Sequence, residues 1–242
     1  MSPAVGAASN PAELLPLVAL HDQAAGPDVL QAGPRRVTRL PASDGAWVVC
    51  KEEVCPGWAA RLRRWLLGSR ARRAAAAARA LLAAGIEVPE PLGALELPGR
   101  TLSFARFMAG PTLARALEVE GHTPGALLLA AARLTARLHA AGFSARDLKP
   151  QNLVLGPGAE LVPVDLDDVR ARAPDRADAV RNLAALDAYA QLAPRRPGVR
   201  ARVEALRVYA QARELPAGPL LREVLAASRA KRARLRARTG GT

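Results

Sequence analysis

The chain has 242 residues, of which 50% are hydrophobic and 24% are charged, and this balance excludes an intrinsically disordered protein. Its 35 Lys and Arg residues against 22 Asp and Glu residues give a net charge of +13, which indicates a polyanionic partner. Two segments, Arg61–Arg73 and Arg229–Arg238, carry almost all of this excess, so the rest of the chain is nearly neutral. No apolar run approaches the roughly 18 residues of a membrane span.

The first part of the chain alternates turn-rich, strand-like and helical stretches. Residues 1–28 are rich in Ala, Pro and Gly and are predicted to form a poorly ordered lead-in with room for a short helical turn. Residues 29–54 are predicted to form strands around a turn at Ser43-Asp44-Gly45, because β-branched and aromatic residues follow that turn. A helix is predicted over residues 58–84, where Ala, Leu and Arg dominate and Gly85 ends the pattern.

The second part of the chain is predominantly helical. Two more strand-like stretches, Ile86–Glu96 and Arg100–Met108, complete a small sheet before the composition changes. The predicted fold class is therefore α+β, with a small β-rich lobe at residues 29–109 and a mostly helical lobe at residues 110–242. Within the second lobe, helices are predicted over Thr112–Val119, over Gly125–Ala141 and from Asp175 to the end, with loops and short strands at 143–168.

One segment of the helical lobe carries the residues of a phosphoryl-transfer site. A helix ends at Gly142, and the loop that follows presents Asp147, Lys149 and Asn152 before an apolar strand. After a further apolar run the chain presents Asp165. A carboxylate orients an attacking hydroxyl, an amide oxygen and a second carboxylate hold Mg²⁺, and a lysine neutralises phosphate charge.

These motifs resemble those of known kinases. The run Arg146-Asp147-Leu148-Lys149-Pro150-Gln151-Asn152 resembles the catalytic loop of the protein-kinase-like fold, and Asp165-Leu166-Asp167 resembles its metal-binding segment. Four segments further resemble the lipopolysaccharide kinase family, which includes the Kdo and heptose kinases: Ser69–Arg73, Leu81–Leu92, Leu138–Phe143 and Val164–Arg170. The resemblance implies a bilobal, ATP-dependent kinase that acts on a sugar of a lipid-linked glycan.

The resemblance also implies a role for each site residue. Asp147 corresponds to the catalytic base, and Lys149 to the residue that contacts the γ-phosphate. Asn152 and Asp165 correspond to the ligands of Mg²⁺, and Lys51 to the strand lysine that contacts the α- and β-phosphates. The expected cofactors are accordingly ATP and Mg²⁺.

The sequence departs from the kinase pattern at four places. Ala145 stands where the catalytic loop usually has His, and Asn182 stands where the family tends to have Asp. No acidic residue lies between Val54 and Ile86, so the helix glutamate that pairs with the strand lysine is missing near Ala74. Glu53 shares a strand face with Lys51 and is a candidate substitute. A Gly-rich phosphate-binding loop is also missing, since Gly33 is the single glycine in the first predicted strand pair before the Gly45 turn.

These departures leave alternatives to a sugar kinase. A pseudokinase that binds a nucleotide or a partner without turnover is the first, and another small-molecule or protein Ser/Thr kinase on the same fold is the second. Only nine residues separate Asp165 from the helix that begins at Asp175, which leaves no room for a long peptide-docking activation segment. A sugar or other small-molecule acceptor is therefore favoured over a protein acceptor.

The basic segments suggest where the protein acts. Trp58, Leu62, Trp65 and Leu66 share one helical face beside arginines, which is typical of an interfacial membrane helix, although packing of that face on the sheet is an equal alternative. Arg229–Arg238 is predicted to be either a solvated helix end or a second site that contacts an anionic partner. Nucleic acid ranks last, because only 3% of residues are aromatic and no nucleic-acid-binding motif is present.

The expected location is the cytoplasm, with peripheral attachment at the inner face of the cytoplasmic membrane. No Lys or Arg precedes Arg35, so we expect no secretory signal peptide. The two cysteines, Cys50 and Cys55, are expected to be ordinary reduced thiols. Of the three histidines, His139 is predicted to pack or to contact the end of its helix, and His21 and His122 are predicted to be exposed.

Overall fold

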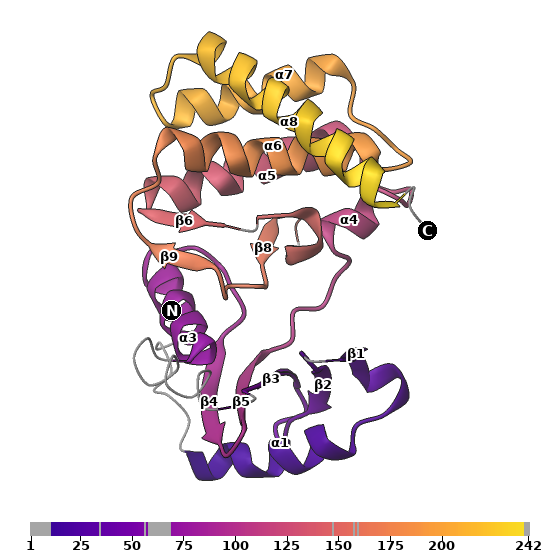
Figure 1. Cartoon of the computed structure of the whole chain (residues 1–242), viewed down its shortest axis with the longest axis vertical. Helices are drawn as coiled ribbons and strands as arrows, with labels where there is room; N and C mark the ends of the chain where they lie inside the picture. The colour runs from indigo at the N-terminus through magenta and orange to yellow at the C-terminus, as the bar shows by residue number, and fades with distance from the viewer. Residues whose placement is uncertain are drawn as a thin grey trace. The chain divides into compact units, whose positions relative to one another are not determined.

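The computed structural model describes residues 11–239 except positions 34, 56, 58–68, 147, 157 and 159. The chain divides into two compact units, Met1–Met108 and Ala109–Thr242, here called the N-terminal unit and the C-terminal unit (Figure 1). The predicted α+β class is confirmed, because the first unit contains a five-stranded antiparallel sheet and the second is mostly helical. The amphipathic helix predicted around Trp58 and Trp65 lies outside the described residues.

The sheet of the N-terminal unit has the strand order β1-β2-β3-β5-β4, and every neighbouring pair is antiparallel. The Ser43-Asp44-Gly45 turn joins β2 to β3 as predicted, with the Asp44 carboxylate accepting from the backbone N–H of Ala46 at 3.1 Å. The strands are β1 (Val29–Gln31), β2 (Val37–Pro41), β3 (Trp47–Val54), β4 (Pro91–Leu97) and β5 (Arg100–Arg106).

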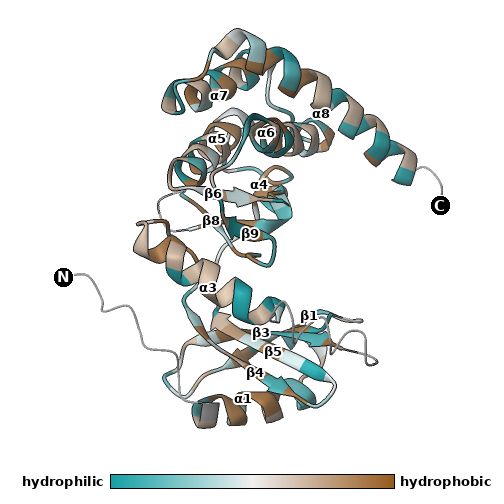
Figure 2. Cartoon of the chain, turned by 60° about the vertical axis from the view of Figure 1, so that its left-hand side comes forward, coloured by the Kyte–Doolittle hydropathy of each residue, from teal (hydrophilic) through white to brown (hydrophobic). Residues whose placement is uncertain are grey.

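The two faces of this sheet are covered by different helices (Figure 2). Helix α1 (Pro11–Gln23) lies on the face that we call the α1 face, and helix α3 (Arg70–Ala83) lies on the opposite face, called the Lys51 face. The α1 face holds the core of the unit, which consists of Leu14, Leu17, Val18, Leu40, Val48, Cys50, Leu95, Leu102 and Phe104. Burial raises the pKa of the Cys50 thiol, which keeps it protonated and unreactive.

Helix α1 differs from the poorly ordered lead-in predicted for residues 1–28. His21, predicted to be exposed, is fully buried, with Nδ1 2.7 Å from Thr38 Oγ1 and Nε2 3.3 Å from Glu52. Asp22 receives a two-pronged hydrogen bond from Arg100, with distances of 2.6 and 2.9 Å. The helix is thus held by partners far along the chain, which the local Ala- and Pro-rich composition does not reveal.

Helix α3 follows the predicted pattern where it is described. Ser69 caps it by accepting from the backbone N–H of Arg72 at 3.2 Å, and Gly85 follows its last turn with a φ of +72°. Its buried side is made of small residues and one leucine, namely Ala71, Ala77, Ala78 and Leu81. The helix therefore packs closely on β4 and β5.

The C-terminal unit joins a helix bundle to two small strand pairs (Figure 1). Helix α4 is shorter than predicted: it ends at Ala116, and a hydrogen-bonded turn continues to Val119. The helices are α4 (Leu113–Ala116), α5 (Pro124–Ala140), α6 (Arg176–Leu192), α7 (Val199–Ala212) and α8 (Ala217–Thr239). The shorter elements are β6 (Phe143–Ala145), the 3₁₀ turn η2 (Pro150–Asn152), β7 (Leu153–Leu155), β8 (Leu161–Pro163) and β9 (Val169–Ala171).

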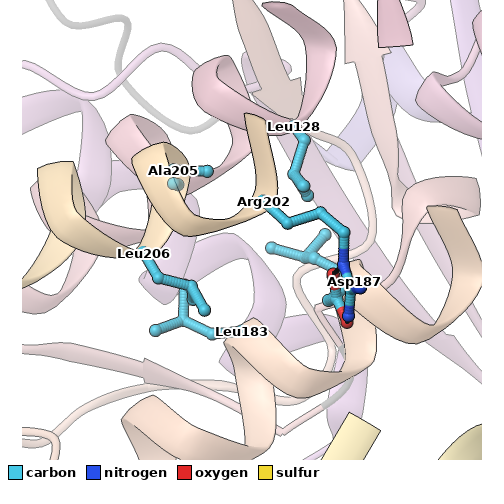
Figure 3. Close-up of a pocket in the computed structure, with 8 residues that line it drawn as sticks. Leu128, Leu183, Asp187, Arg202, Ala205 and Leu206 are labelled. Carbon is cyan, nitrogen blue, oxygen red and sulfur yellow. Dashed lines mark hydrogen bonds and ion pairs between the residues drawn. The ribbon is translucent and has the colours of Figure 1, made fainter. Parts of the chain in front are cut away.

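A buried ion pair ties three of these helices together. Asp187 on α6 accepts from Arg202 on α7 at 2.7 and 2.8 Å and from the hydroxyl of Ser228 on α8 at 2.5 Å. The carboxylate is only 3% exposed. Figure 3 shows Arg202 and Asp187 facing each other beside a small hollow lined by leucines of α5, α6 and α7. The carboxylate depends on these partners because an unpaired charge inside a bundle is costly.

We therefore expect Arg202→Met to destabilise the C-terminal unit strongly, by about 3–5 kcal/mol, because Asp187 is left as a buried charge without its cation. Urea unfolding measures the loss. The matched control is Arg176→Met, which breaks an exposed pair with Glu223 at 39% and 47% exposure and should cost at most about 1 kcal/mol. Equal, small losses in both variants would contradict a structural role for the buried pair.

Candidate functional site

The two strand pairs of the C-terminal unit bring the catalytic-loop segment beside the segment of Asp165. In the pair β7–β8, Leu153 lies opposite Pro163, and the backbone N–H of Val164 continues the ladder by donating to the Asn152 carbonyl at 2.9 Å. Asp165 is the next residue after Val164. The structure thus brings Asn152 and the start of the Asp165 segment together, although 13 positions separate the two residues in the sequence.

The pair β6–β9 joins the same two segments at their other ends. Ala145 lies opposite Val169, and the N–H of Arg146 donates to the Asp168 carbonyl at 3.3 Å. Residues 146–152 and 164–168 are therefore connected at both ends by backbone hydrogen bonds. Asp147 itself lies outside the described residues, so its assignment as the base stays a prediction.

Buried leucines hold the two segments while their polar side chains stay accessible. Leu148 and Leu166 are 4% and 6% exposed, and Leu153 is fully buried. Asn152 donates its N–H to the Lys149 carbonyl at 2.9 Å, which closes the short 3₁₀ turn. The side chains of Lys149, Asn152 and Asp165 are half-buried, and each has an interaction within the protein.

The donor set of these segments suits a magnesium ion. Asn152 offers an amide oxygen and Asp165 a carboxylate, which are the hard oxygen ligands that Mg²⁺ takes. Within the described part of the chain, no group of three or more His, Cys, Asp or Glu side chains is placed to hold a metal. Mg²⁺ is commonly bound by one or two protein groups together with substrate phosphates, and the residues present fit that mode.

A close approach at Gly110 fixes the segment in front of β7. A Cβ atom built at Gly110 would lie 2.1 Å from the Leu155 carbonyl oxygen, and the residue has a φ of +137°. The next residue, Pro111, accepts from the N–H of Leu155 at 2.9 Å, and Thr112 forms a bridge with Val154. Only glycine satisfies both the backbone angle and the contact.

A buried polar cluster lies behind the site, at the end of α5. His139 is 2% exposed; its Nδ1 lies 2.6 Å from the Tyr209 hydroxyl and its Nε2 lies 3.1 Å from Asn182 Nδ2. The packing role predicted for His139 is confirmed. Sequence reasoning did not find Tyr209, which comes from α7, 70 residues further along, and no local pattern marks it.

This cluster keeps the histidine neutral. Burial, together with the nearby positive charge of Arg213, lowers the pKa of His139 to about 4. Burial also raises the pKa of Tyr209 to about 12. Asn182, where the family tends to have Asp, adds no negative charge to stabilise an imidazolium, and its Oδ1 atom is buried without a hydrogen-bond partner.

In the N-terminal unit, Lys51 lies in the middle of the sheet on β3. Its backbone neighbours are Val37 on β2 and Ser103 on β5, and its side chain is half-buried. Glu53, considered as a partner for Lys51, forms an ion pair with Arg70 of α3 at 3.5 Å. Helix α3 therefore contributes an arginine that pairs with Glu53, and it has no acidic residue to pair with Lys51.

A second cation on the Lys51 face was not anticipated from the sequence. The Arg39 guanidinium lies 4.6 Å from the centre of the Trp47 ring and 5.7 Å from that of Phe107. Arg39 is opposite Val49 in the register, and Val49 is two residues from Lys51. The sequence alone does not predict this cation–π contact, because the strand register must be known before Arg39 can be placed beside Trp47.

A β-rich unit followed by a helical unit with these paired loops is consistent with the protein-kinase-like fold. Residues 110–209 match the model of the lipopolysaccharide kinase (Kdo/WaaP) family. The predicted resemblance to this family is confirmed over that segment, and the match supports a kinase. A search of curated proteins found no match.

Two observations bear on the membrane prediction. Among the described residues, no helix has both the length and the hydropathy needed to cross a bilayer. In the basic segment Arg61–Arg73, two of the three described arginines form ion pairs, Arg70 with Glu53 and Arg72 with Glu96. Residues 61–68 lie outside the described part.

The neutral His139 should make the protein less stable in acid. A group whose pKa is depressed on folding takes up its proton more readily when unfolded, so stability is full above pH 6.5 and falls as the pH drops towards 4. The contribution is on the order of 3 kcal/mol. Unfolding free energies measured between pH 7 and pH 4 should show a smaller fall for His139→Gln than for the wild type.

Two variants serve as controls. Tyr209→Phe keeps the buried imidazole and should lose stability at every pH while retaining the acid-dependent fall. Asn182→Asp places a carboxylate beside Nε2, raises the pKa of His139 and should reduce the fall. An unchanged pH dependence in His139→Gln would show that other groups cause the acid instability.

Proposed function

We propose that the protein is an ATP- and Mg²⁺-dependent phosphotransferase that phosphorylates a hydroxyl of a lipopolysaccharide-core-type sugar. The observation that carries the proposal is the hydrogen bond between Val164 and Asn152, which joins the two candidate loops inside the segment that matches the kinase family. Lys149, Asn152 and Asp165 stand on these loops and remain partly accessible.

The reaction assigned to this site is in-line transfer. The acceptor oxygen forms a bond to the γ-phosphorus while the bond from that phosphorus to the β–γ bridging oxygen breaks, and ADP leaves. Asp147 orients the acceptor hydroxyl and takes its proton, and Lys149 offsets negative charge on the transferred group. Most of the rate enhancement comes from positioning and electrostatic stabilisation.

Mg²⁺ would be held by Asn152 and Asp165 together with the nucleotide phosphates. When bound, it neutralises phosphate charge and aligns the phosphoryl group. The contribution of the chain is to present an amide oxygen and a carboxylate on two segments that are paired through their backbones. This pairing supports the assignment, because two flexible loops would lose more conformational entropy on binding the ion.

The acceptor class follows from the short connection after the site. Only β9 and a brief turn separate Asp165 from α6, which begins at its cap residue Asp175. The Asp175 side chain accepts from the N–H of Asp178 and the Asp178 side chain accepts from the N–H of Asp175, so the connection is closed tightly. A compact connection favours a sugar hydroxyl over a docked peptide.

A catalytically silent nucleotide-binding protein is the second candidate. The observation that favours it is the Arg70–Glu53 ion pair together with the absence of any acid in α3, since active kinases pair the strand lysine with a helix glutamate. The two candidates differ in turnover and not in nucleotide binding.

Substitution of Asp147 and Asp165 distinguishes the active kinase from the silent nucleotide-binding protein. We expect Asp147→Asn and Asp165→Asn each to lower Mg²⁺-dependent phosphate transfer to lipopolysaccharide-core sugars by at least about 100-fold, because one removes the base and the other a metal ligand. The control is Glu160→Gln, an exposed carboxylate in the β7–β8 turn, which should keep full activity. Activity unaffected in both Asp variants would refute the site, and nucleotide binding without turnover on a broad sugar panel would favour the silent protein.

The proposed partner surface is an anionic membrane, contacted through the end of α8. The first half of this helix packs in the bundle through Leu220, Val224 and Ser228, which are fully buried. After Glu223 the helix contains no acid, and its second half exposes Arg229, Arg234, Arg236 and Arg238. A lipid-linked sugar acceptor lies at such a surface, which on this proposal is the inner face of the cytoplasmic membrane; nucleic acid is not the proposed partner.

Binding to vesicles tests this surface. The triple variant Arg234→Gln, Arg236→Gln, Arg238→Gln should bind vesicles containing anionic lipid about 100-fold more weakly, at about 1 kcal/mol per arginine, and wild-type binding should weaken as salt is raised. The matched control removes the same charge from α7 and the turn before it with Arg196→Gln, Arg200→Gln, Arg207→Gln. Equal wild-type binding to neutral and anionic vesicles, or equal losses in both triple variants, would refute the surface.

A further inference from the structure

The connection between β1 and β2 stands where a phosphate-binding loop is needed, yet it has a single glycine, Gly33. Kinases cover the nucleotide phosphates with a Gly-rich loop whose backbone approaches the phosphates closely. Here the loop continues instead into two arginines, Arg35 and Arg36. The inference below rests on the proposed nucleotide-dependent function.

The register of the sheet brings this loop to the level of Lys51. Val37, the first residue of β2, lies directly opposite Lys51 on β3. One residue earlier, the Arg36 carbonyl accepts from the N–H of Glu52 at 2.8 Å. The arginines therefore enter the sheet at the position of the candidate phosphate-binding lysine.

The two arginines of the loop have different surroundings. Arg36 donates to the Ala24 carbonyl, just beyond α1, at 2.5 Å, so its side chain is committed to the α1 face. Arg35, at a bend of the loop, lies two residues before Val37, the residue that is paired with Lys51. Arg35 is exposed, and the described part of the chain provides it with no hydrogen bond or ion pair.

The half of the Lys51 face next to this loop suits an anionic ligand. The two carboxylates nearest along its strands are already engaged, Glu53 by Arg70 at 3.5 Å and Asp28 by Arg39 at 3.5 Å. Asp28 offsets Arg39 and Arg70 offsets Glu53, so the exposed Arg35 adds positive charge at the end of β2 that lies opposite Lys51. A guanidinium group binds phosphate oxygens through two parallel N–H donors. In a kinase with a glycine-rich loop, backbone amides supply such N–H donors instead.

We infer that Arg35 is a phosphate-binding residue that, together with Lys51, takes the place of the missing glycine-loop amides and contacts the terminal phosphates of the nucleotide. The ligand class is a nucleoside di- or triphosphate. The nucleoside part is not held by Arg35, and so the contribution of this residue depends on the number of phosphates.

Calorimetric titration of the full chain with ATP, ADP and adenosine tests the inference. Arg35→Gln should bind ATP about 10- to 100-fold more weakly than the wild type, as expected for a charge-assisted contact, and should bind adenosine equally well. Arg35→Lys, which keeps the charge without the planar fork, should fall between the two. The matched control is Arg36→Gln, which removes the same charge from the α1 face and should leave the ATP affinity unchanged.

The outcomes separate this inference from the proposed function. Wild-type affinity for ATP in Arg35→Gln, or an equal loss for ATP and adenosine, would overturn the role of Arg35 while leaving the kinase proposal intact. Failure of the wild-type chain to bind any of the three ligands would overturn both. Thermal unfolding of Arg35→Gln should match that of the wild type, since the side chain is exposed.

Discussion

The antiparallel pairing of β7 with β8 is the constraint on which the candidate site depends. It is a short pair of three residues each, and its last backbone bond joins Asn152 to Val164. Without that register, Asp165 would stand on a loop that is not connected to Asn152, and the two proposed magnesium ligands would not be held near each other. The second pair, β6–β9, then holds the far ends of the same segments. Backbone hydrogen bonds thus hold the two segments in place, and these segments carry the side chains of the candidate site.

Behind these strands, the helices are joined by buried leucines and alanines and also by buried polar contacts. The chain has few aromatic residues, and alanine fills much of α5, α6 and α7. Small side chains let helices approach closely but bury little apolar surface each. Asp187 with Arg202, and His139 with Tyr209, add directional bonds between helices to this packing.

Local patterns in the sequence were sufficient for much of the fold and for part of the site. Helix α5 was predicted from its apolar stripe through Leu127 and Leu134, and the Ser43–Gly45 turn from its residue types. The motif around Lys149 and Asn152 and the acid at Asp165 stand out in the sequence through their resemblance to kinase motifs, and their roles stay predictions. Helix α1, the burial of His21 and the stack of Arg39 on Trp47 were not, because each depends on partners that only the folded chain brings near.

The tight contact at Gly110 makes this position sensitive to mutation although it has no chemical role. Any single-base change that replaces the glycine adds a Cβ atom 2.1 Å from the Leu155 carbonyl. Relief of that clash displaces Pro111 from β7, and β7 is the strand whose register sets Asn152 against Val164. A substitution at residue 110 would therefore disturb the pairing of the two candidate loops, although the residue lies in neither of them.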